Sequence, residues 1–577
     1  MRDLRYIFSY LGKYRKDLYI AIFLIFIETC FELVIPMLMA SLIDDGVAKA
    51  DVSFMLRDGL LMIICALLAL FTGLTYARFS SRAAYGLGAN IREAEYRRIQ
   101  SFSFSNIDRF SSGSLITRLT SDATIIQNAI IGGLRPLVRS PVMLFLGIFF
   151  SFQMNDDLAL IFLVVAPALG LMLFFIIKTI APRYEITQKA LDKLNEVVEE
   201  NLRAIRTVKA FVTEDEEKKK FYAANDKLRD ITVNTTRIAV LNLPAFQSVM
   251  YITIVMIMLF GGRMILSGSL TVGALTGFLS YVLQVLNSLV MFSNVFLLLS
   301  RSLTSSHRIM EVLKEESTIK NRDDAEKNID RYDIAFEDVY FKYSESAKEY
   351  TLSDINLKIE EGSTVGILGQ TGSGKSTLVQ LISRLYDVSK GSIKIGGRDI
   401  REYDITALRE NIVTVLQKNT LFSGSIRDNI RWGKMDASDE EIINALKKAD
   451  AYSFVMGFPQ DLSTDLEQGG VNVSGGQKQR LAIARALIKN PRIIIFDDSL
   501  SAVDTKTEMT IRAILKQIEN ATKIFISQRI STVMNSDMIV VLDNGRIADI
   551  GNHDELIRNS SIYREIYSSQ LKGGFNG

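Results

Sequence analysis

Histidine, cysteine, tryptophan and proline are scarce in this 577-residue chain, which contains two, two, one and eight of them. Both cysteines, Cys30 and Cys65, lie in apolar runs, so they provide neither a disulfide framework nor a metal-binding set, and we expect them to be buried as small side chains. An excess of charge is also missing, because 67 lysines and arginines oppose 65 aspartates and glutamates. With no long basic tract, the sequence argues against a nucleic-acid partner.

Apolar sequence is what the chain has in abundance: 48% of its residues are hydrophobic, and nearly all of the surplus precedes Ser300. Six apolar segments stand out, and all but the third are near or above the roughly 20 residues that cross a bilayer as a helix. The third is expected to begin earlier, near Ile130. The segments are Leu18 to Ile43, Gly59 to Ala77, Ser140 to Met154, Leu158 to Ala181, Ile238 to Gly262 and Val272 to Ser300. They predict an all-α, six-helix domain within a lipid bilayer.

Connections between these segments alternate in length. Short loops join the first to the second, the third to the fourth and the fifth to the sixth, whereas two long connections carry many lysines and arginines. The positive-inside tendency places these long connections, and with them both termini, in the cytoplasm. The first segment is too long for a signal-peptide core, so we expect an uncleaved anchor, and Met1 to Asp17 is expected to lie in the interface as a short helix.

Each long connection contains helical sequence with a break, near Asn106 to Leu119 in the first and near Thr207 to Asp215 in the second. One interpretation is a solvated helical hairpin. The other is a short crosswise helix at each tip that contacts the domain after the membrane helices.

Polar residues within the apolar segments are costly and therefore candidates for function. Glu28 and Glu32 are four residues apart and share one helix face, and Gln284 and Asn287 lie in the last segment. These four residues are candidates for a substrate cavity, in which a carboxylate pair would suit a cationic ligand. Hydrogen bonds between helices with no ligand role are the alternative.

Composition changes at 314–333, a charged linker that separates a membrane domain, 1–313, from a second domain, 334–577. The second domain alternates strands with helical sequence, including a mostly helical stretch from Ile405 to Asp461, which predicts a mainly parallel α/β sheet. The predicted strands are Ile334 to Tyr343, Leu352 to Ile359, Thr364 to Leu368, Ile493 to Phe496, Ile524 to Ser527 and Met538 to Leu542, with another short strand after the turn at 543–545.

A P-loop pattern lies between a predicted strand and a predicted helix, Thr377 to Leu385. Its backbone N–H groups and the helix N-terminus can bind a phosphate chain. Lys375 adds positive charge at the β- and γ-phosphates, and the Ser376 hydroxyl can ligate Mg²⁺. The residues expected to bind ATP here are Gly369, Gln370, Thr371, Gly372, Ser373, Gly374, Lys375, Ser376 and Thr377. A glycine-rich turn with a chance lysine is the alternative.

Two further motifs complete the nucleotide site. Four apolar residues followed by an acid, Ile493 to Asp497, form a Walker B strand, and Asp497 is placed to hold Mg²⁺. Before it, the sequence Val473, Ser474, Gly475, Gly476, Gln477 opens a predicted helix. This pentapeptide resembles the signature motif of ABC ATPases, and its position between the two Walker motifs makes the resemblance specific.

The resemblance extends over essentially all 577 residues, to a half-transporter of the ABC exporter family. It implies that Tyr343 stacks on adenine and that Gln417 contacts Mg²⁺ and the membrane domain. Thr464 to Gly470 is similar to the exporter X-loop, and Ser501 to Asp504 resembles the D-loop, with Ser501 and Asp504 as its site residues. In that family two ATPase domains pack head to tail, so a homologous partner subunit is implied, whose ATP the signature residues 473–477 contact.

Two positions depart from the family pattern: Asp498 replaces the usual catalytic glutamate, and Gln528 replaces the switch histidine. Aspartate is one methylene shorter, and a displacement of ~1 Å can cost on the order of 10²-fold in rate. The resemblance therefore implies a heterodimer in which this chain binds Mg-ATP but hydrolyses it slowly. The alternative is that the two substitutions are sequence variation that the site tolerates. A homodimer of this chain would contain two weak sites.

The combined reading is ATP-driven export of drugs or other amphipathic small molecules across the cytoplasmic (inner) membrane, with the ATPase domain in the cytoplasm. A lipid flippase or a peptide exporter uses the same architecture. A reading from another class is an ATP-gated channel or regulator, in which Asp498 and Gln528 mark the loss of pumping.

Overall fold

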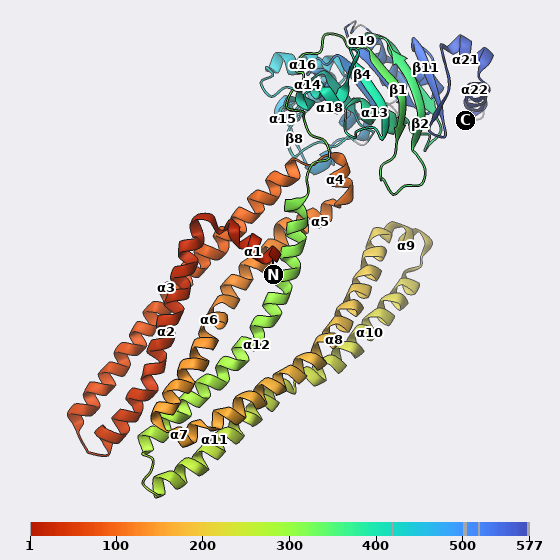
Figure 1. The fold of residues 1–577 in the computed structure, drawn as a ribbon. Coiled ribbons are helices and arrows are strands. Elements are labelled where there is room, and N and C mark those ends of the chain that lie inside the picture. Colours follow the sequence, from red (N-terminus) through yellow and green to blue (C-terminus); the bar gives the residue numbers. More distant parts are fainter. Residues whose placement is uncertain (1, 418, 500–504, 517, 519, 574–577) are drawn as a thin grey trace. The chain divides into compact units, whose positions relative to one another are not determined.

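The computed structural model describes residues 2–417, 419–499, 505–516, 518 and 520–573 (Figure 1). Its contacts divide the chain into two units, one of Met1–Gln100 and Ser112–Glu315 and the other of Ser101–Ser111 and Glu316–Gly577. The division thus falls inside the predicted linker, and a segment from the first long connection belongs to the second unit.

The first unit is helical throughout. Its elements are α1 (Arg2–Ile7), η1 (Phe8–Tyr14), α2 (Arg15–Ser41), η2 (Leu42–Val47), α3 (Val52–Gln100), α5 (Ser112–Thr117), η3 (Arg118–Asp122), α6 (Ala123–Met154), α7 (Asp156–Ala159), α8 (Ile161–Arg203), α9 (Ile205–Phe211), α10 (Glu214–Ala239), α11 (Asn242–Leu266) and α12 (Val272–Lys314).

Several of these helices are much longer than a membrane requires, because charged sequence continues the helix beyond each apolar segment. At 1.5 Å per residue the 49 residues of α3 extend about 73 Å. Along its apolar part, Leu60, Leu67, Phe71 and Leu74 are each more than half exposed. Such a row of exposed apolar side chains suits a helix surrounded by lipid.

Within the described residues, five helical stretches are long and apolar enough to cross a membrane: Arg2–Val47, Val52–Gln100, Ser112–Met154, Glu214–Leu266 and Val272–Phe292. Five of the six predicted segments overlap them. The fourth, Leu158 to Ala181, lies in α7 and α8 and is not among them, so the count of six stays a prediction.

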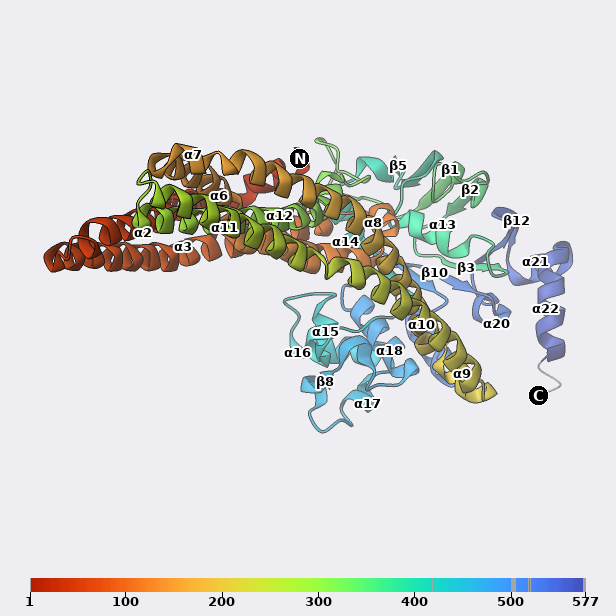
Figure 2. The same ribbon diagram turned by 90° about the horizontal axis from the view of Figure 1, so that it is seen from below.

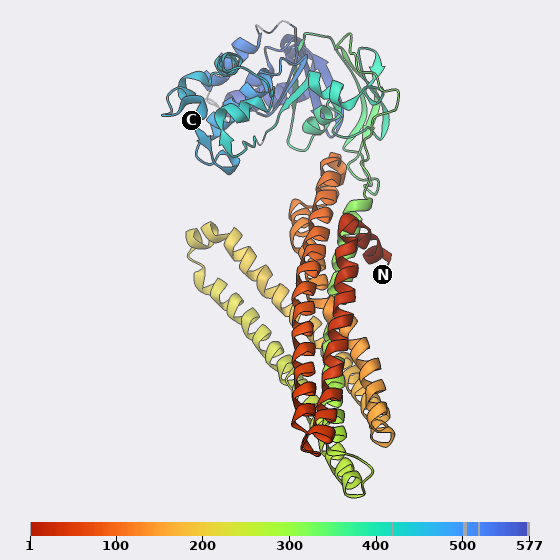
Figure 3. The ribbon, with the colours of Figure 1, turned by 90° about the vertical axis from the view of Figure 1, so that its left-hand side faces the viewer.

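Both predicted breaks contain short helices. In the second connection α8 and α10 form an antiparallel hairpin with α9 at its tip, and this hairpin diverges from the paired helices α2 and α3 (Figure 3). The hairpin turns after α9 because Val212 adopts a left-handed conformation, with φ 54°. In the first connection, α4 (Phe104–Arg109) and α5 occupy the break, and α4 belongs to the second unit.

The second unit mixes strands and helices. Its strands are β1 (Ile334–Phe341), β2 (Leu352–Ile359), β3 (Thr364–Gly369), β4 (Lys390–Ile395), β5 (Arg398–Asp399), β6 (Ile412–Val415), β7 (Gly424–Ser425), β8 (Asp465–Leu466), β9 (Ile493–Asp497), β10 (Thr522–Ser527), β11 (Met538–Asp543) and β12 (Arg546–Gly551). After α4, its helices are α13 (Lys375–Ile382), η4 (Ile400–Glu402), α14 (Ile405–Asn411), α15 (Ile426–Arg431), α16 (Asp439–Lys448), α17 (Tyr452–Val455), η5 (Asp461–Ser463), η6 (Gln468–Gly470), α18 (Gly475–Leu487), α19 (Thr505–Lys516), α20 (Ile530–Val533), α21 (His553–Asn559) and α22 (Ser561–Gly573).

The central sheet has the order β12-β11-β3-β10-β9-β6, and every neighbouring pair is parallel except β11 with β12. This confirms the mainly parallel sheet. A separate antiparallel sheet, β2-β1-β4-β5, was not predicted, and β6 lies within the stretch expected to be mostly helical. The β-branched run of β6, Ile412 to Thr414, favours a strand once β9 supplies a parallel neighbour.

Burial on both faces explains the apolar strands of this sheet. Along β9, Ile493 and Ile495 pack into one core while Ile494 and Phe496 pack into the other. A strand covered on both faces reads as a continuous apolar run rather than an alternating one. The helices α15, α16, α17 and α18 gather together, apart from β1 and β2 (Figure 2).

Candidate functional site

The P-loop lies between the carboxyl end of β3 and the start of α13, as predicted. The backbone of the loop requires its glycines. A Cβ on Gly369 would lie 2.4 Å from the carbonyl oxygen of Leu542, and Gly374 has φ +94°, which L side chains rarely adopt. The loop therefore keeps a tight path whose N–H groups precede a helix N-terminus, an arrangement that binds anions.

Lys375 is nearly buried at this loop, with 8% of its surface exposed. Its Nζ atom donates to the carbonyl oxygens of Gly369, at 2.9 Å, and Gln370, at 2.6 Å. Burial lowers the pKa of Lys375, against the opposing influence of Asp498 and Asp497. The ammonium is thus held next to the phosphate-binding loop with two carboxylates nearby.

Asp497 ends β9 on the adjacent side of the loop. Its Oδ1 atom accepts a hydrogen bond of 2.8 Å from the hydroxyl of Ser376, the first residue after the P-loop lysine. Burial raises the pKa of Asp497, while the Ser376 hydrogen bond acts in the opposite direction. The structure therefore brings together two of the three side chains predicted to hold Mg²⁺, and the third, Gln417, lines the same pocket.

The two unusual residues lie at the same edge of the sheet. Asp498 has a left-handed backbone, with φ 46°, and its N–H donates to the Ile526 carbonyl at 3.1 Å. Its Oδ2 atom accepts from Gln417 Nε2 at 3.3 Å, and Gln528 Oε1 accepts from Thr371 Oγ1 at 3.5 Å. Burial raises the pKa of Asp498, and Lys375 opposes this shift.

These groups enclose one pocket of about 320 Å³ in the second unit. Thr351, which precedes β2, also lines it; sequence analysis missed this residue, whose only signal is its place before a predicted strand. The other lining residues are Thr371, Gly372, Gly374, Lys375, Ser376, Thr377, Gln417, Asp497, Asp498, Ile526, Ser527 and Gln528.

Tyr343 follows β1 beside the pocket. Its hydroxyl shares a hydrogen bond of 2.9 Å with Thr377 and donates to Gln380 Oε1 at 3.2 Å, so α13 fixes the position of the ring. Nearly half of the Tyr343 surface remains exposed, which suits a ring expected to stack on a base.

The signature residues 473–477 lie at the N-terminus of another element, α18, and just before it, and none of them is among the described residues that line the pocket. Ser474 caps this helix, and its side chain accepts from the Gln477 N–H while Gln477 accepts from the Ser474 N–H. The helix N-terminus at Gly475 and Gly476 is thereby fixed. The predicted D-loop residues Ser501 and Asp504 lie outside the described residues.

The residues present fit both Mg²⁺ and a nucleotide. Serine hydroxyl and carboxylate oxygens are the ligands that Mg²⁺ prefers, and Ser376 and Asp497 already present them 2.8 Å apart. A bound Mg²⁺ supplies neutralisation of phosphate charge.

In the membrane unit, Glu28 and Glu32 of α2 form ion pairs with Arg135 and Arg139 of α6. Each carboxylate is thus paired with an arginine of a neighbouring helix, which favours the alternative of contacts between helices. The substrate cavity stays a prediction. The arginine partners were missed, since apolar periodicity predicts helices but not which faces meet. Gln284 is half-buried on α12, and Asn287 is exposed.

Models of known families match both units. The model of the ABC transporter transmembrane region matches residues 18–289, and the model described as ABC transporter matches residues 352–501. The chain is 37% identical to the uncharacterized ABC transporter ATP-binding protein YfiB of Bacillus subtilis, over 98% of each chain. The chain belongs to the ABC transporter family. It is an exporter half-transporter, in which one membrane region is fused to one ATPase domain.

Other relatives of this ABC half-transporter have names that state a cargo. It is 31% identical to the putative multidrug export protein YgaD of Bacillus subtilis, over 97% of this chain and 98% of that one. It is also 31% identical to the ATP-dependent lipid A-core flippase of Desulfotalea psychrophila, over 96% of this chain and 97% of that one. A bacterial Atm1-family ABC exporter solved with ATP bound shares the fold, with a TM-score of 0.81, 26% identity, and coverage of 96% of this chain and 98% of that one.

Proposed function

We propose that this chain is one half of a heterodimeric exporter that moves amphipathic small molecules, including drugs, out across the cytoplasmic membrane. In this proposal the chain binds Mg-ATP at a slow site and donates its signature residues, 473–477, to a competent site of a homologous subunit. The observation that supports it is a single pocket lined by Lys375, Ser376 and Asp497, the residues expected to bind Mg-ATP, together with Asp498 and Gln528, the two residues that depart from the family pattern.

Chemistry at the site supports binding with weak hydrolysis. Asp498 carries the right charge, and burial raises its pKa toward the range useful for a base, but its carboxyl group is one methylene closer to the main chain than that of glutamate. Gln528 can donate to a γ-phosphate, but it carries no imidazole charge. ATP binding would close the two ATPase domains, and hydrolysis, mainly at the partner's site, would reset the transporter.

The experiment that tests this proposal measures ATP hydrolysis by the purified chain alone and after co-expression with a half-transporter encoded beside it. We expect activity only in the complex, and we expect it to drop when the partner's catalytic glutamate is replaced. Brisk hydrolysis by this chain alone would contradict the slow-site proposal.

Restoring the usual residues should restore the site. In a complex whose partner site is inactivated, Asp498→Glu should raise hydrolysis roughly 10-fold, because the longer side chain recovers part of a displacement of ~1 Å. Gln528→His added to it should raise the rate further, and Asp498→Asn is the matched variant that should lower it. An unchanged rate in Asp498→Glu would mean that aspartate is already a competent base.

A lipid is the second candidate cargo, favoured by the identity with the lipid A-core flippase. Inside-out vesicles distinguish the two: ATP-driven concentration of an amphipathic dye supports small-molecule export, whereas ATP-driven transfer of a labelled lipid between leaflets without dye uptake supports a flippase. If the vesicles show neither dye uptake nor lipid transfer although the protein still binds ATP, a channel or regulator is favoured.

A further inference from the structure

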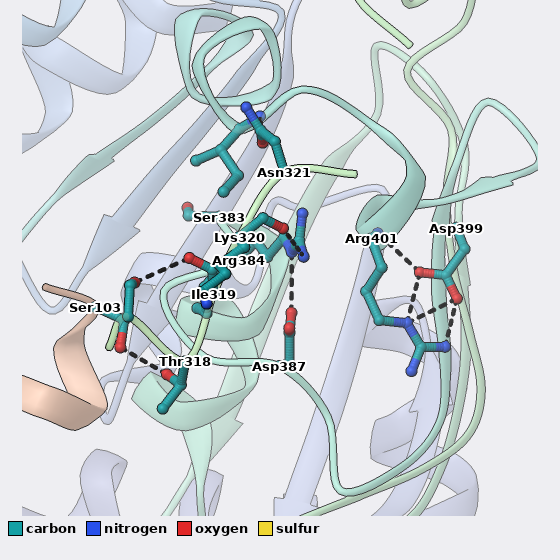
Figure 4. Close-up of polar contacts among 12 residues, drawn as sticks. Ser103, Thr318, Ile319, Lys320, Asn321, Ser383, Arg384, Asp387, Asp399 and Arg401 are labelled. Atoms are coloured by element: carbon teal, nitrogen blue, oxygen red, sulfur yellow. Dashed lines mark hydrogen bonds and ion pairs between the residues drawn. The ribbon is translucent and has the colours of Figure 1, made fainter. Parts of the chain in front are cut away.

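The short helix α4 belongs to the second unit and is held there by two sets of contacts. At its N-terminal end, Ser103 shares a hydrogen bond of 2.6 Å with Thr318, and Asn106 Nδ2 donates to the Glu316 carbonyl at 3.0 Å. Figure 4 shows Ser103 facing Thr318 of the segment that follows α12. In sequence, α4 lies between the membrane helices α3 and α6.

A second set of contacts joins α4 to Tyr386. The Tyr386 hydroxyl donates to Asp108 Oδ2 at 2.6 Å, and the rings of Tyr386 and Phe104 lie 6.1 Å apart, edge to face. Tyr386 is only 8% exposed. Burial, and then the contact with Asp108, raise the pKa of Tyr386, so its hydroxyl stays protonated and donates at physiological pH.

The same tyrosine also touches the nucleotide pocket's aromatic residue. The rings of Tyr386 and Tyr343 lie 5.2 Å apart and perpendicular, a favourable arrangement for aromatic pairs. Tyr343 is tied through its hydroxyl to Thr377 and Gln380 of α13. Tyr386 therefore contacts α4 with its hydroxyl and ring and contacts Tyr343 with the same ring.

The chain around Tyr386 is held firmly. Arg384, with φ 47°, ends the P-loop helix, and its buried guanidinium donates to Asp387 at 2.9 Å and to the Lys320 carbonyl at 3.4 Å (Figure 4). Arg409 donates in turn to the carbonyls of Ser383, at 3.2 Å, and Arg384, at 2.7 Å. A turn fixed by this many contacts transmits a displacement instead of absorbing it.

We propose that Tyr386 is a positioning residue that couples occupancy of the adenine position at Tyr343 to the docking of α4 through Asp108. The inference rests on the proposed function in one respect, namely that ATP binds with its base at Tyr343. When a base fixes the Tyr343 ring, the perpendicular Tyr386 ring loses freedom, and its hydrogen bond to Asp108 is held more of the time. ATP then stabilises α4 on the ATPase domain, and by linkage docked α4 favours ATP.

The test is hydrogen exchange of the peptide 101–111 in the full chain, reconstituted in lipid nanodiscs, with and without Mg-ATP. Exchange in α4 reports its local opening. In the unmodified chain we expect ATP to slow it about fivefold or more, the lower range of measured coupling between sites. Tyr386→Phe, which keeps the ring and removes the donor, should lose most of this slowing, while ATP affinity falls by no more than the same factor.

A double-mutant cycle separates the relay from general damage. Asp108→Ala should lose the slowing as Tyr386→Phe does, the double variant should lose no more than either, and Asp108→Asn, whose amide oxygen still accepts, should recover part of it. Tyr403→Phe is the matched control, because Tyr403 is also buried but donates to the Ile395 carbonyl, at 3.0 Å. Its ATP-dependent slowing should equal that of the unmodified chain.

Each contrary outcome has a distinct meaning. If the unmodified chain binds ATP but exchange in 101–111 does not change, or if Tyr386→Phe keeps the full slowing, or if the two losses add, the relay is overturned while the proposed function stands. If the unmodified chain binds no ATP, the proposed function fails, and the relay fails with it.

Discussion

Replacing Lys375 with alanine is expected to weaken ATP binding by this chain roughly 100-fold, because deleting a contact from a charged group costs about 1.5–3 kcal/mol. The ammonium lies at the P-loop, with its Nζ atom 2.6 Å from the Gln370 carbonyl, where a β/γ-phosphate would replace the loop carbonyls as its partner. Titration of the detergent-purified chain with a fluorescent ATP analogue measures the change.

The fold should survive this substitution. Because burial lowers the pKa of Lys375, the folded chain disfavours its charged form, and removing the charge relieves that cost below the folded pKa. The substitution also loses the hydrogen bonds of Lys375 to the Gly369 and Gln370 carbonyls, which acts in the opposite direction, so we expect little change in the thermal midpoint at neutral pH. Lys358→Ala is the matched control, since Lys358 is an exposed lysine on β2 paired with Glu360, and it should leave ATP affinity unchanged.

The same variant examines the role of the slow site. If ATP held here keeps the two ATPase domains in contact between turnovers, Lys375→Ala in the heterodimer should increase their separation, measured between spin labels on the two domains. Undiminished contact would refute the holding role, although the loss of ATP affinity would still stand.

Sequence reasoning predicted the strands and turns around the proposed phosphate site because the pattern that marks them is local. Gly369 to Thr377 and Ile493 to Asp497 each combine a strand, a turn and a charged or polar residue within a few positions, and β3 and β9 lie at the predicted places. Two parallel strands end at the same edge of a sheet, so Ser376 and Asp497 meet although 121 residues separate them.

Other features depend on partners that no local pattern specifies. The strand β6 forms because β9 supplies its neighbour, and the helix expected to reach Leu385 ends at Ile382 because Arg384 turns the chain into a left-handed conformation. Tyr386 and Asp108 are 278 residues apart, and no pattern in either segment predicts their contact. Contacts between segments far apart in the sequence are thus the features of the fold and the site that the sequence alone could not predict.

Removing either partner of the ion pair between Glu28 and Arg135 is expected to lower the stability of the protein, and the loss should be larger when Arg135 is replaced. The Glu28 side chain is 4% exposed and that of Arg135 is 39% exposed, so the two partners do not depend on one another equally. Removing one partner of a buried pair leaves an uncompensated charge and costs about 3–5 kcal/mol. Arg135→Met should approach that cost because it isolates the buried carboxylate, and Glu28→Gln should cost less because Arg135 keeps access to its surroundings.

Replacing both partners should restore most of the loss. Glu28 Oε2 and Arg135 Nε have no hydrogen-bond partner within the described part of the chain, so the pair is incompletely satisfied and adds little net stability over an uncharged pair. The double variant Glu28→Gln with Arg135→Met should therefore regain a thermal midpoint close to that of the unmodified chain. Unfolding of the purified protein in nanodiscs, followed by light scattering and intrinsic fluorescence, gives the ranking.

The neighbouring pair is the matched control for this asymmetry. Glu32 and Arg139 belong to the same two helices, one turn further along, but their side chains are 25% and 24% exposed. Because neither charge is fully isolated when its partner is removed, Arg139→Met should lower the midpoint less than Arg135→Met, and Glu32→Gln should lower it by about as much as Arg139→Met. Equal losses in Arg135→Met and Arg139→Met would show that burial of the carboxylate does not set the cost, and that helix packing around the arginines does.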